Sequence, residues 1–212
     1  MTSPARKLKK SAVKNIVRFP SIKSNGGKTI LVESLLESKY CLHLEFDPGI
    51  CAYSPQPKTF KIQDEDITYT PDFEVLYVSG SRSYVEVKPA RFASSDHYQY
   101  IFSCFESALQ GTGITFLVVD EVDIYEQPLL SNYEKLYQYK KRPLLNMRNL
   151  HECAKGINIS MPLSHLISKL EDRVQLREIY SWLALGYLQF DMKTEHLTMA
   201  TEVRFHVSGS LD

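Results

Sequence analysis

The sequence contains no apolar run of about 18 residues, the length that a membrane-spanning helix requires. Its N-terminal stretch, MTSPARKLKKSAVKN, also lacks the apolar segment of a secretory signal. Apolar residues make up 43% of the chain and charged residues 24%, with only 9 glycines and 10 prolines among 212 residues. This composition excludes disordered and collagen-like chains. We therefore expect a cytoplasmic globular protein with no membrane contact.

Cysteine pairs at metal-binding spacing are also missing. The four cysteines are widely separated and form no C-x-x-C pair; they are Cys41, Cys51, Cys104 and Cys153. Zinc sites and the disulfide frameworks of small secreted proteins both depend on close, regular cysteine spacing. We therefore expect reduced, buried thiols rather than a zinc site.

Acidic residues are absent before Glu33, although the chain as a whole has zero net charge. The charged residues of this first stretch are all basic: Arg6, Lys7, Lys9, Lys10, Lys14, Arg18, Lys23 and Lys28. Basic side chains that neutralise phosphates release condensed counterions and so bind nucleic acid. We predict that residues 1–28 form a basic arm along a phosphate backbone; a solvated tail is the alternative.

Residues 29–127 are predicted to form an α/β domain. Leucines at mostly helical spacing indicate an amphipathic helix over 29–46, which DPG ends. Residues 50–90 indicate a three-strand meander, with 67–78 as one long strand. An amphipathic helix over 96–113 and an apolar strand over 114–122, buried on both faces, complete the order helix, three strands, helix, strand.

Residues 128–212 are predicted to form a second domain, because prolines interrupt the helical pattern around the boundary. MPLSHLISKLED and VQLREIYSWLALGYLQFD indicate two short helices, and the segments YLQFD and LTMATEVRFHV a hairpin. Two helices followed by a hairpin describe a small winged-helix module. We predict Trp182, Leu183 and Leu185 to be core residues.

The second of these helices offers little for reading DNA bases. Between Val174 and Leu188 only Arg177 is basic, whereas helices that read the major groove usually present several polar or basic side chains. The C-terminal module is therefore expected to contact a protein rather than to read bases.

Candidate catalytic residues lie on neighbouring predicted strands. Alternation along a strand places Glu86 and Lys88 on one face, with Val85 and Val87 toward the core, and a hairpin can bring Asp72 close to Glu86. Converging carboxylates repel each other unless a cation lies between them, and Mg²⁺ suits oxygen ligands. Such an ion can activate water at a scissile phosphate while Lys88 balances charge. A surface ion pair across strands is the alternative.

A third acid could complete this site from the first predicted helix. Glu37 lies among the apolar neighbours Leu36 and Tyr40, and Glu33 lies one turn earlier. Helical periodicity alone does not choose between the two glutamates.

These motifs resemble a known family. The run LLESKYCLHLEFDP, then Gln56 and Pro57, then TPDF and VEVKPA, resemble the TnsA endonuclease subunit of heteromeric transposases, over residues 29–125. The order of elements is similar to the restriction-endonuclease-like PD-(D/E)xK nuclease core. The resemblance implies a bacterial, metal-dependent hydrolase that cleaves DNA at transposon ends.

The resemblance also implies the site residues. It selects Glu37 over Glu33 and implies the catalytic set Glu37, Asp72, Glu86 and Lys88. The implied metal ligands are Asp72, Glu86, Glu37 and Val87, for Mg²⁺ with Mn²⁺ as a substitute. Some family members have Gln in place of Glu86.

The resemblance further implies the partners. They are transposon-end DNA, a TnsB-type transposase that cuts and joins the 3′ ends, and a TnsC-type AAA+ regulator. The alternatives are a free-standing restriction or repair nuclease, and a DNA-binding or assembly protein with an inactive core.

Overall fold

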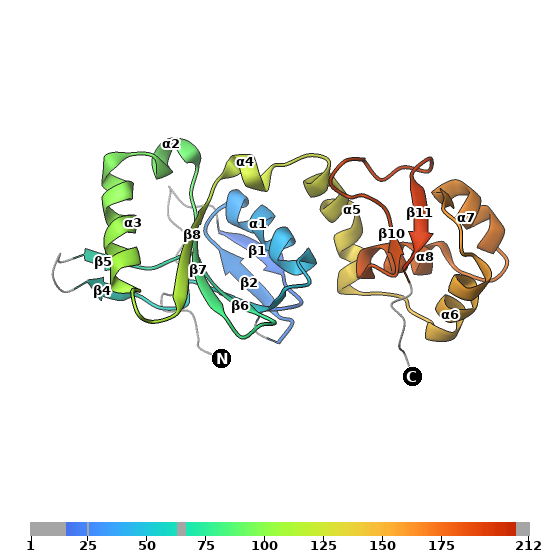
Figure 1. Ribbon diagram of the computed structural model, residues 1–212, viewed down its shortest axis with the longest axis horizontal. Helices are drawn as coiled ribbons and strands as arrows, with labels where there is room; N and C mark the ends of the chain where they lie inside the picture. Colours follow the sequence, from blue (N-terminus) through green and yellow to red (C-terminus); the bar gives the residue numbers. More distant parts are fainter. Residues whose placement is uncertain (1–15, 25, 63–66, 207–212) are drawn as a thin grey trace. The chain divides into compact units, whose positions relative to one another are not determined.

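The computed structural model describes residues 16–24, 26–62 and 67–206 (Figure 1). The chain divides into two compact units, the first ending at Glu126 and the second beginning at Gln127. The boundary expected from the sequence lies one residue later. Both units mix helices and sheets, so the α/β class predicted from the sequence is confirmed.

A four-stranded mixed sheet forms the centre of the first unit (Figure 1). Its strands, in spatial order, are β3 (Ile50–Pro55), β6 (Phe73–Tyr77), β7 (Arg82–Val87) and β8 (Ile114–Val119). Strand β6 pairs antiparallel with both β3 and β7, as the predicted meander requires, and β8 runs parallel to β7. A parallel connection needs a crossover, which contains the confirmed helix α3 (Asp96–Ala108) and the short α2 (Ala90–Ala93).

The strand predicted over 67–78 is divided in two. Its first part, β5 (Ile67–Tyr69), pairs with β4 (Phe60–Ile62) in a separate hairpin, and only its second part enters the central sheet as β6. Pro71 lies at the break, where a residue without an N–H cannot continue a hydrogen-bonded ladder. The break places Asp72 immediately before β6.

Strand β8 is not buried on both faces, contrary to the sequence-based expectation. It lies at the edge of the sheet, and Leu117 and Val118 are 42% and 38% exposed. Pattern alone cannot distinguish an apolar edge strand from a central one, because the difference depends on which strands pair with it.

The helix predicted over 29–46 is also shorter than expected. Residues Thr29–Val32 form strand β2, which pairs with β1 (Val17–Pro20), and helix α1 spans only Leu35–Phe46. Buried Ile30 and Val32 alternate with exposed Leu31, which is the period of a strand.

The basic arm predicted over residues 1–28 also differs from the structure, because part of it forms a paired strand. Strand β1 belongs to the ordered first unit, so Arg18 lies in a strand rather than in a separate arm. Residues 1–15, with five of the eight basic side chains, lie outside the described residues.

A buried carboxylate attaches the β1–β2 hairpin to the rest of the first unit. Glu45, on α1, is fully buried, and its Oε1 accepts hydrogen bonds from Ser21 Oγ at 2.6 Å, Ile22 N at 2.9 Å and Tyr53 Oη at 2.9 Å. The three donors come from the segment after β1 and from β3. One glutamate therefore connects three elements.

Aromatic rings pack between α3 and the strands. Phe105 is fully buried, with ring centroids 4.6 Å from Tyr69, 5.1 Å from Phe116 and 5.8 Å from Tyr84. Aromatic pairs at such distances stabilise a core beyond their buried area. This cluster holds α3 and the β4–β5 hairpin in place beside the end of β7.

The second unit contains helices and a small sheet. Its helices are α5 (Leu129–Lys141), α6 (Met147–Gly156), α7 (Leu163–Leu170) and α8 (Leu176–Leu185). Its strands, in spatial order, are β10 (Leu188–Gln189), β11 (Glu202–Phe205) and β9 (Met161–Pro162). The predicted core residues Trp182 and Leu183 are fully buried, whereas Leu185 is half-buried.

The cysteines are free, as expected, but they are not all buried. Cys41 and Cys153 are buried, Cys104 is half-buried and Cys51 is exposed on β3. Among residues 16–24, 26–62 and 67–206, no helix has the length and apolar character to cross a membrane.

We expect Glu45→Ala to lower the free energy of unfolding by about 3 kcal/mol, because it leaves several buried donors without an acceptor. Urea denaturation followed by circular dichroism measures this loss. Glu106→Ala, at an exposed position of α3, is the matched control and should change stability by less than about 0.5 kcal/mol. Equal stability of the two variants would contradict the role assigned to Glu45.

Candidate active site

The register of β6 against β7 places Asp72 beside the end of β7. Phe73 pairs with Val85, so Asp72 lies across from Glu86. The Oδ2 atom of Asp72 accepts a hydrogen bond from the main-chain N–H of Val87 at 2.9 Å. The carboxylate is thereby fixed to the neighbouring strand.

Glu86 and Lys88 form an ion pair at the same end of the sheet. Glu86 Oε1 lies 2.8 Å from Lys88 Nζ, and Glu86 Oε2 accepts a hydrogen bond from Tyr69 Oη at 2.7 Å. Lys88 Nζ also lies over the ring of Tyr98, 4.5 Å from its centroid. Helix α3 and strand β5 thus position these two side chains, and Lys88 keeps 22% of its side chain exposed.

The other two predicted site residues are Val87 and Glu37. The side chain of Val87 is buried, as predicted, and carries no ligating atom, so only its main chain can contact an ion. Glu37, also buried, lies in the first turn of α1. Its Oε1 accepts a hydrogen bond from Ser34 Oγ at 2.8 Å, and its Oε2 accepts one from Glu33 N at 2.8 Å.

Glu37 therefore has a structural role that sequence analysis missed. Its own N–H donates to Ser34 Oγ at 3.1 Å, while its carboxylate accepts from Glu33 N rather than from Ser34 N, so Ser34 and Glu37 form a variant of the capping box at the start of α1. The spacing S-x-x-E was the available sequence signal. Because the helix begins at this cap, Glu37 occupies its first turn, where its charge raises the pKa of Asp72, whereas Glu33 precedes the helix.

Negative charge accumulates where these residues meet. The pKa of Asp72 is well above its usual value, first because of burial and then because of the charges of Glu86 and Glu37. The pKa of Glu37 is also raised, mainly by burial and further by the charges of Glu33 and Glu86. Burial lowers the pKa of Lys88, but the neighbouring carboxylates Glu86 and Asp72 outweigh it and raise this pKa overall.

The donor set fits a hard divalent cation at Asp72 and Glu86. Both supply carboxylate oxygens, and the pKa of Asp72 is raised first by burial and then by the charges of Glu86 and Glu37, with Lys88 as the ammonium paired with Glu86. Within the described part of the chain, no group of three or more His, Cys, Asp or Glu side chains is arranged to hold a metal. Mg²⁺ commonly binds through one or two carboxylates, with waters and substrate phosphates as its other ligands.

Gln56 also lies at this site, although its residue type gave no reason to expect a functional role. Its main-chain N–H donates to the carbonyl oxygen of Asp72 at 2.7 Å, its φ is 45°, and its side chain is buried. Neither atom of its amide has a hydrogen-bond partner among the described residues. Strained backbone and unsatisfied polar atoms concentrate at functional sites. The dipeptide Gln56-Pro57 was the only signal in the sequence.

The sequence matches no protein-family model, and no curated protein matches it. A function for this protein is therefore inferred from the geometry at the end of β7 and from the motifs in the sequence.

We expect Gln56→Met to raise the free energy of unfolding by about 1–3 kcal/mol, because it keeps the side-chain volume and removes two unsatisfied buried polar atoms. Gln110→Met, at an exposed position, is the control and should leave stability unchanged. Thermal and urea denaturation of both variants measure the difference. A Gln56→Met protein less stable than wild type would show that the buried amide does find partners.

Proposed function

We propose that this protein is a metal-dependent DNA endonuclease, the TnsA-type subunit of a heteromeric transposase, which cleaves the 5′ ends of a transposon. The observation that carries the proposal is the convergence of Asp72, Glu86 and Lys88 at the adjoining ends of β6 and β7. The sheet order β3-β6-β7-β8, with α3 in the crossover, supports a restriction-endonuclease-like PD-(D/E)xK core.

Asp72 and Glu86 would hold Mg²⁺, or Mn²⁺ in its place, with the main chain of Val87 beside them. When bound, such an ion polarises a scissile phosphate and lowers the pKa of a coordinated water. The protein's part is to fix both carboxylates on adjacent strands, one through the N–H of Val87 and the other through Tyr69. Carboxylates held in this way lose little side-chain freedom when they act.

Lys88 supplies the positive charge that phosphodiester hydrolysis needs. A bond from the water oxygen to phosphorus forms while the bond from phosphorus to the leaving oxygen breaks. The water loses a proton to solvent, the leaving oxygen takes one up from solvent, and negative charge builds on the phosphoryl oxygens. The Lys88 ammonium, held by Glu86 and the Tyr98 ring, can stabilise that charge or orient the water. Its partial exposure leaves it accessible to DNA.

Glu37 is the third acid of the proposed set. Both of its oxygens accept hydrogen bonds from the helix cap, so it acts on the site through its charge in this arrangement. This charge raises the pKa of Asp72 and thereby strengthens the requirement for a cation. For Glu37 to bind the metal directly, its hydrogen bond from Ser34 Oγ or from Glu33 N would have to break.

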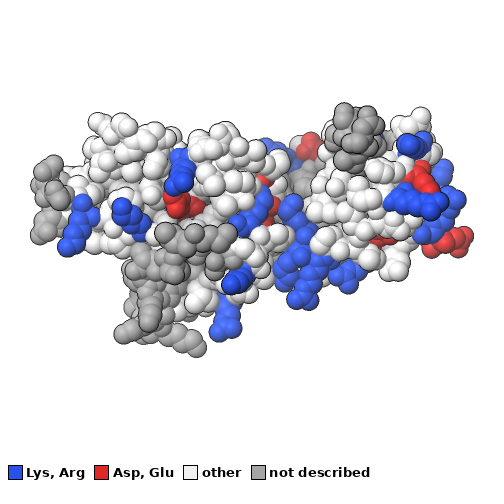
Figure 2. All heavy atoms as spheres, turned by 90° about the horizontal axis from the view of Figure 1, so that it is seen from below, with Lys and Arg blue, Asp and Glu red and all other residues white. Residues whose placement is uncertain are grey.

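The charge distribution supports work with partners. Net charge is zero, although on the face drawn in Figure 2 basic side chains are more widespread than acidic ones. A neutral protein binds DNA weakly by bulk charge alone, so delivery of the transposon end by a TnsB-type transposase fits the chain. The order α7, α8, β10, β11 supports a winged-helix module in the second unit, which would serve contact with a TnsC-type regulator.

We expect Asp72→Asn and Lys88→Met each to reduce Mg²⁺-dependent cleavage by at least about 100-fold, because each removes a charge that acts at the reacting phosphate. Both should remain folded by circular dichroism. The matched controls are Asp96→Asn and Lys61→Met, at exposed positions, which should cleave like wild type. Cleavage at wild-type rate by either site variant would overturn the assignment.

Strand-specific mapping of end-labelled transposon DNA tests the transposase role. With the partner transposase present, Asp72→Asn should lose the 5′ cuts, keep 3′ joining and convert excision into a joined, replicative-type product. Efficient cutting of naked DNA without a partner would favour a free-standing nuclease. No cutting by the wild-type protein in Mg²⁺ with all partners present would favour an assembly protein.

A further inference from the structure

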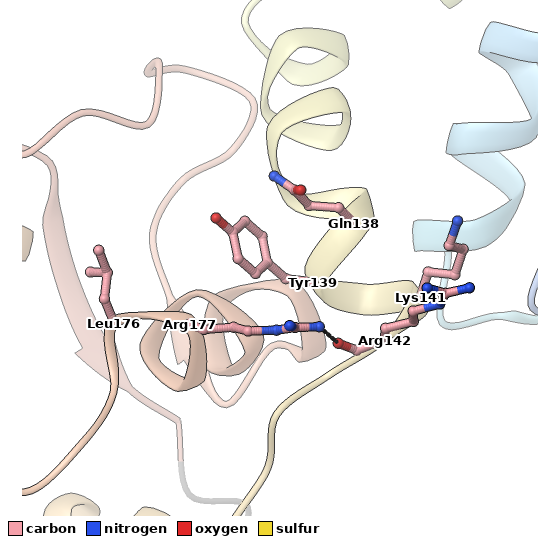
Figure 3. A pocket seen from close by; sticks show the side chains of 6 residues that line it. All are labelled: Gln138, Tyr139, Lys141, Arg142, Leu176 and Arg177. Carbon is pink, nitrogen blue, oxygen red and sulfur yellow. Dashed lines mark hydrogen bonds between the residues drawn. The ribbon is translucent and has the colours of Figure 1, made fainter.

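The second unit contains a hollow of about 590 Å³ between the end of α5 and the beginning of α8 (Figure 3). The residues that line it are Gln138, Tyr139, Lys141, Arg142, Leu176 and Arg177. Figure 3 shows the cationic groups gathered at one end of the site, with the Tyr139 ring and Leu176 toward the other. The hollow thus has a basic part and an apolar part.

Among the described residues, three cations and no carboxylate line this hollow. Arg142 and Arg177 are exposed, and Lys141 is half-buried. None of the three is paired with an acidic side chain in the part of the chain that the structure describes. Unpaired cations in a hollow attract an anionic ligand, because the surrounding protein reduces solvent screening.

The hollow is also partly organised for that ligand. An amino group of Arg177 donates to the main-chain carbonyl of Arg142 at 3.0 Å, which holds the guanidinium against the end of α5. The Tyr139 ring stacks on Tyr180 at a centroid distance of 5.0 Å. An arginine already held in place loses less conformational freedom when its remaining N–H groups bind a phosphate.

We propose that this hollow binds the phosphodiester backbone of DNA, so that the second unit holds the substrate by its phosphates and not by its bases. The identity of the polymer rests on the proposed endonuclease function; the anionic character of the ligand rests on the hollow alone. Backbone contact agrees with α8, where Arg177 is the one basic residue between Val174 and Leu188. Gln138 and the hydroxyl of Tyr139 add uncharged donors to the lining of the hollow.

The test is the salt dependence of binding by the full chain to a labelled DNA duplex in EDTA, where no cleavage occurs. The triple variant Lys141→Gln, Arg142→Gln, Arg177→Gln should flatten the slope of log affinity against log salt by about 2–3, since each lost phosphate contact removes about 0.9. Arg148→Gln, an exposed arginine of α6 paired with Glu152, is the matched control and should keep the wild-type slope.

Two further measurements separate the outcomes. The double variant Arg142→Lys, Arg177→Lys keeps the charge and should retain the wild-type slope, which a purely structural role would not explain. A wild-type slope in the triple variant would overturn the proposal. The second measurement is binding to poly-glutamate. A triple variant that loses binding to poly-glutamate but keeps binding to DNA would identify an acidic polypeptide as the ligand and would also overturn the proposal. Failure of the endonuclease proposal would leave these EDTA measurements unchanged, because they do not depend on cleavage.

Discussion

The hydrogen bond from the Val87 N–H to Asp72 Oδ2 is the contact on which the candidate site depends. It exists because Phe73 pairs with Val85, so the residue before β6 lies across from the last residues of β7. A shift of one residue in this register would turn Asp72 to the opposite face of the sheet. The site therefore requires a correctly paired sheet before it requires any ligand.

The same contact concentrates negative charge, which opposes stability. Burial and the charges of Glu86 and Glu37 raise the pKa of Asp72, while Lys88 is the ammonium that balances them. Tyr69 and the α1 cap hold the acids in place by hydrogen bonds instead of neutralising them. An excess of carboxylate in a partly buried site is favourable for function when a cation and a phosphate complete it.

The two units divide the proposed work between chemistry and holding DNA. The first unit places the acids and Lys88 at the end of β7, and the second presents Arg142 and Arg177 at a hollow whose described lining holds no carboxylate. Arginine pairs well with phosphate because its planar fork donates two parallel hydrogen bonds. Under this proposal, local clusters of this kind would let a chain of zero net charge contact DNA without a uniformly basic surface.

Local periodicity and turn residues are enough to predict the α/β class, helix α3 and the buried Trp182, and to propose that Asp72 and Glu86 converge. It could not determine that Thr29–Val32 forms a strand or that β8 is an edge, since both depend on which distant segment pairs with them. The S-x-x-E spacing of Ser34 and Glu37 already signalled the cap of α1 in the sequence. The Gln56 amide, which has no partner among the described residues, and the cationic hollow are visible in the three-dimensional structure alone. These features arise where elements far apart in the sequence pack together, and hydrogen bonding and burial there depend on neighbours that no local pattern contains.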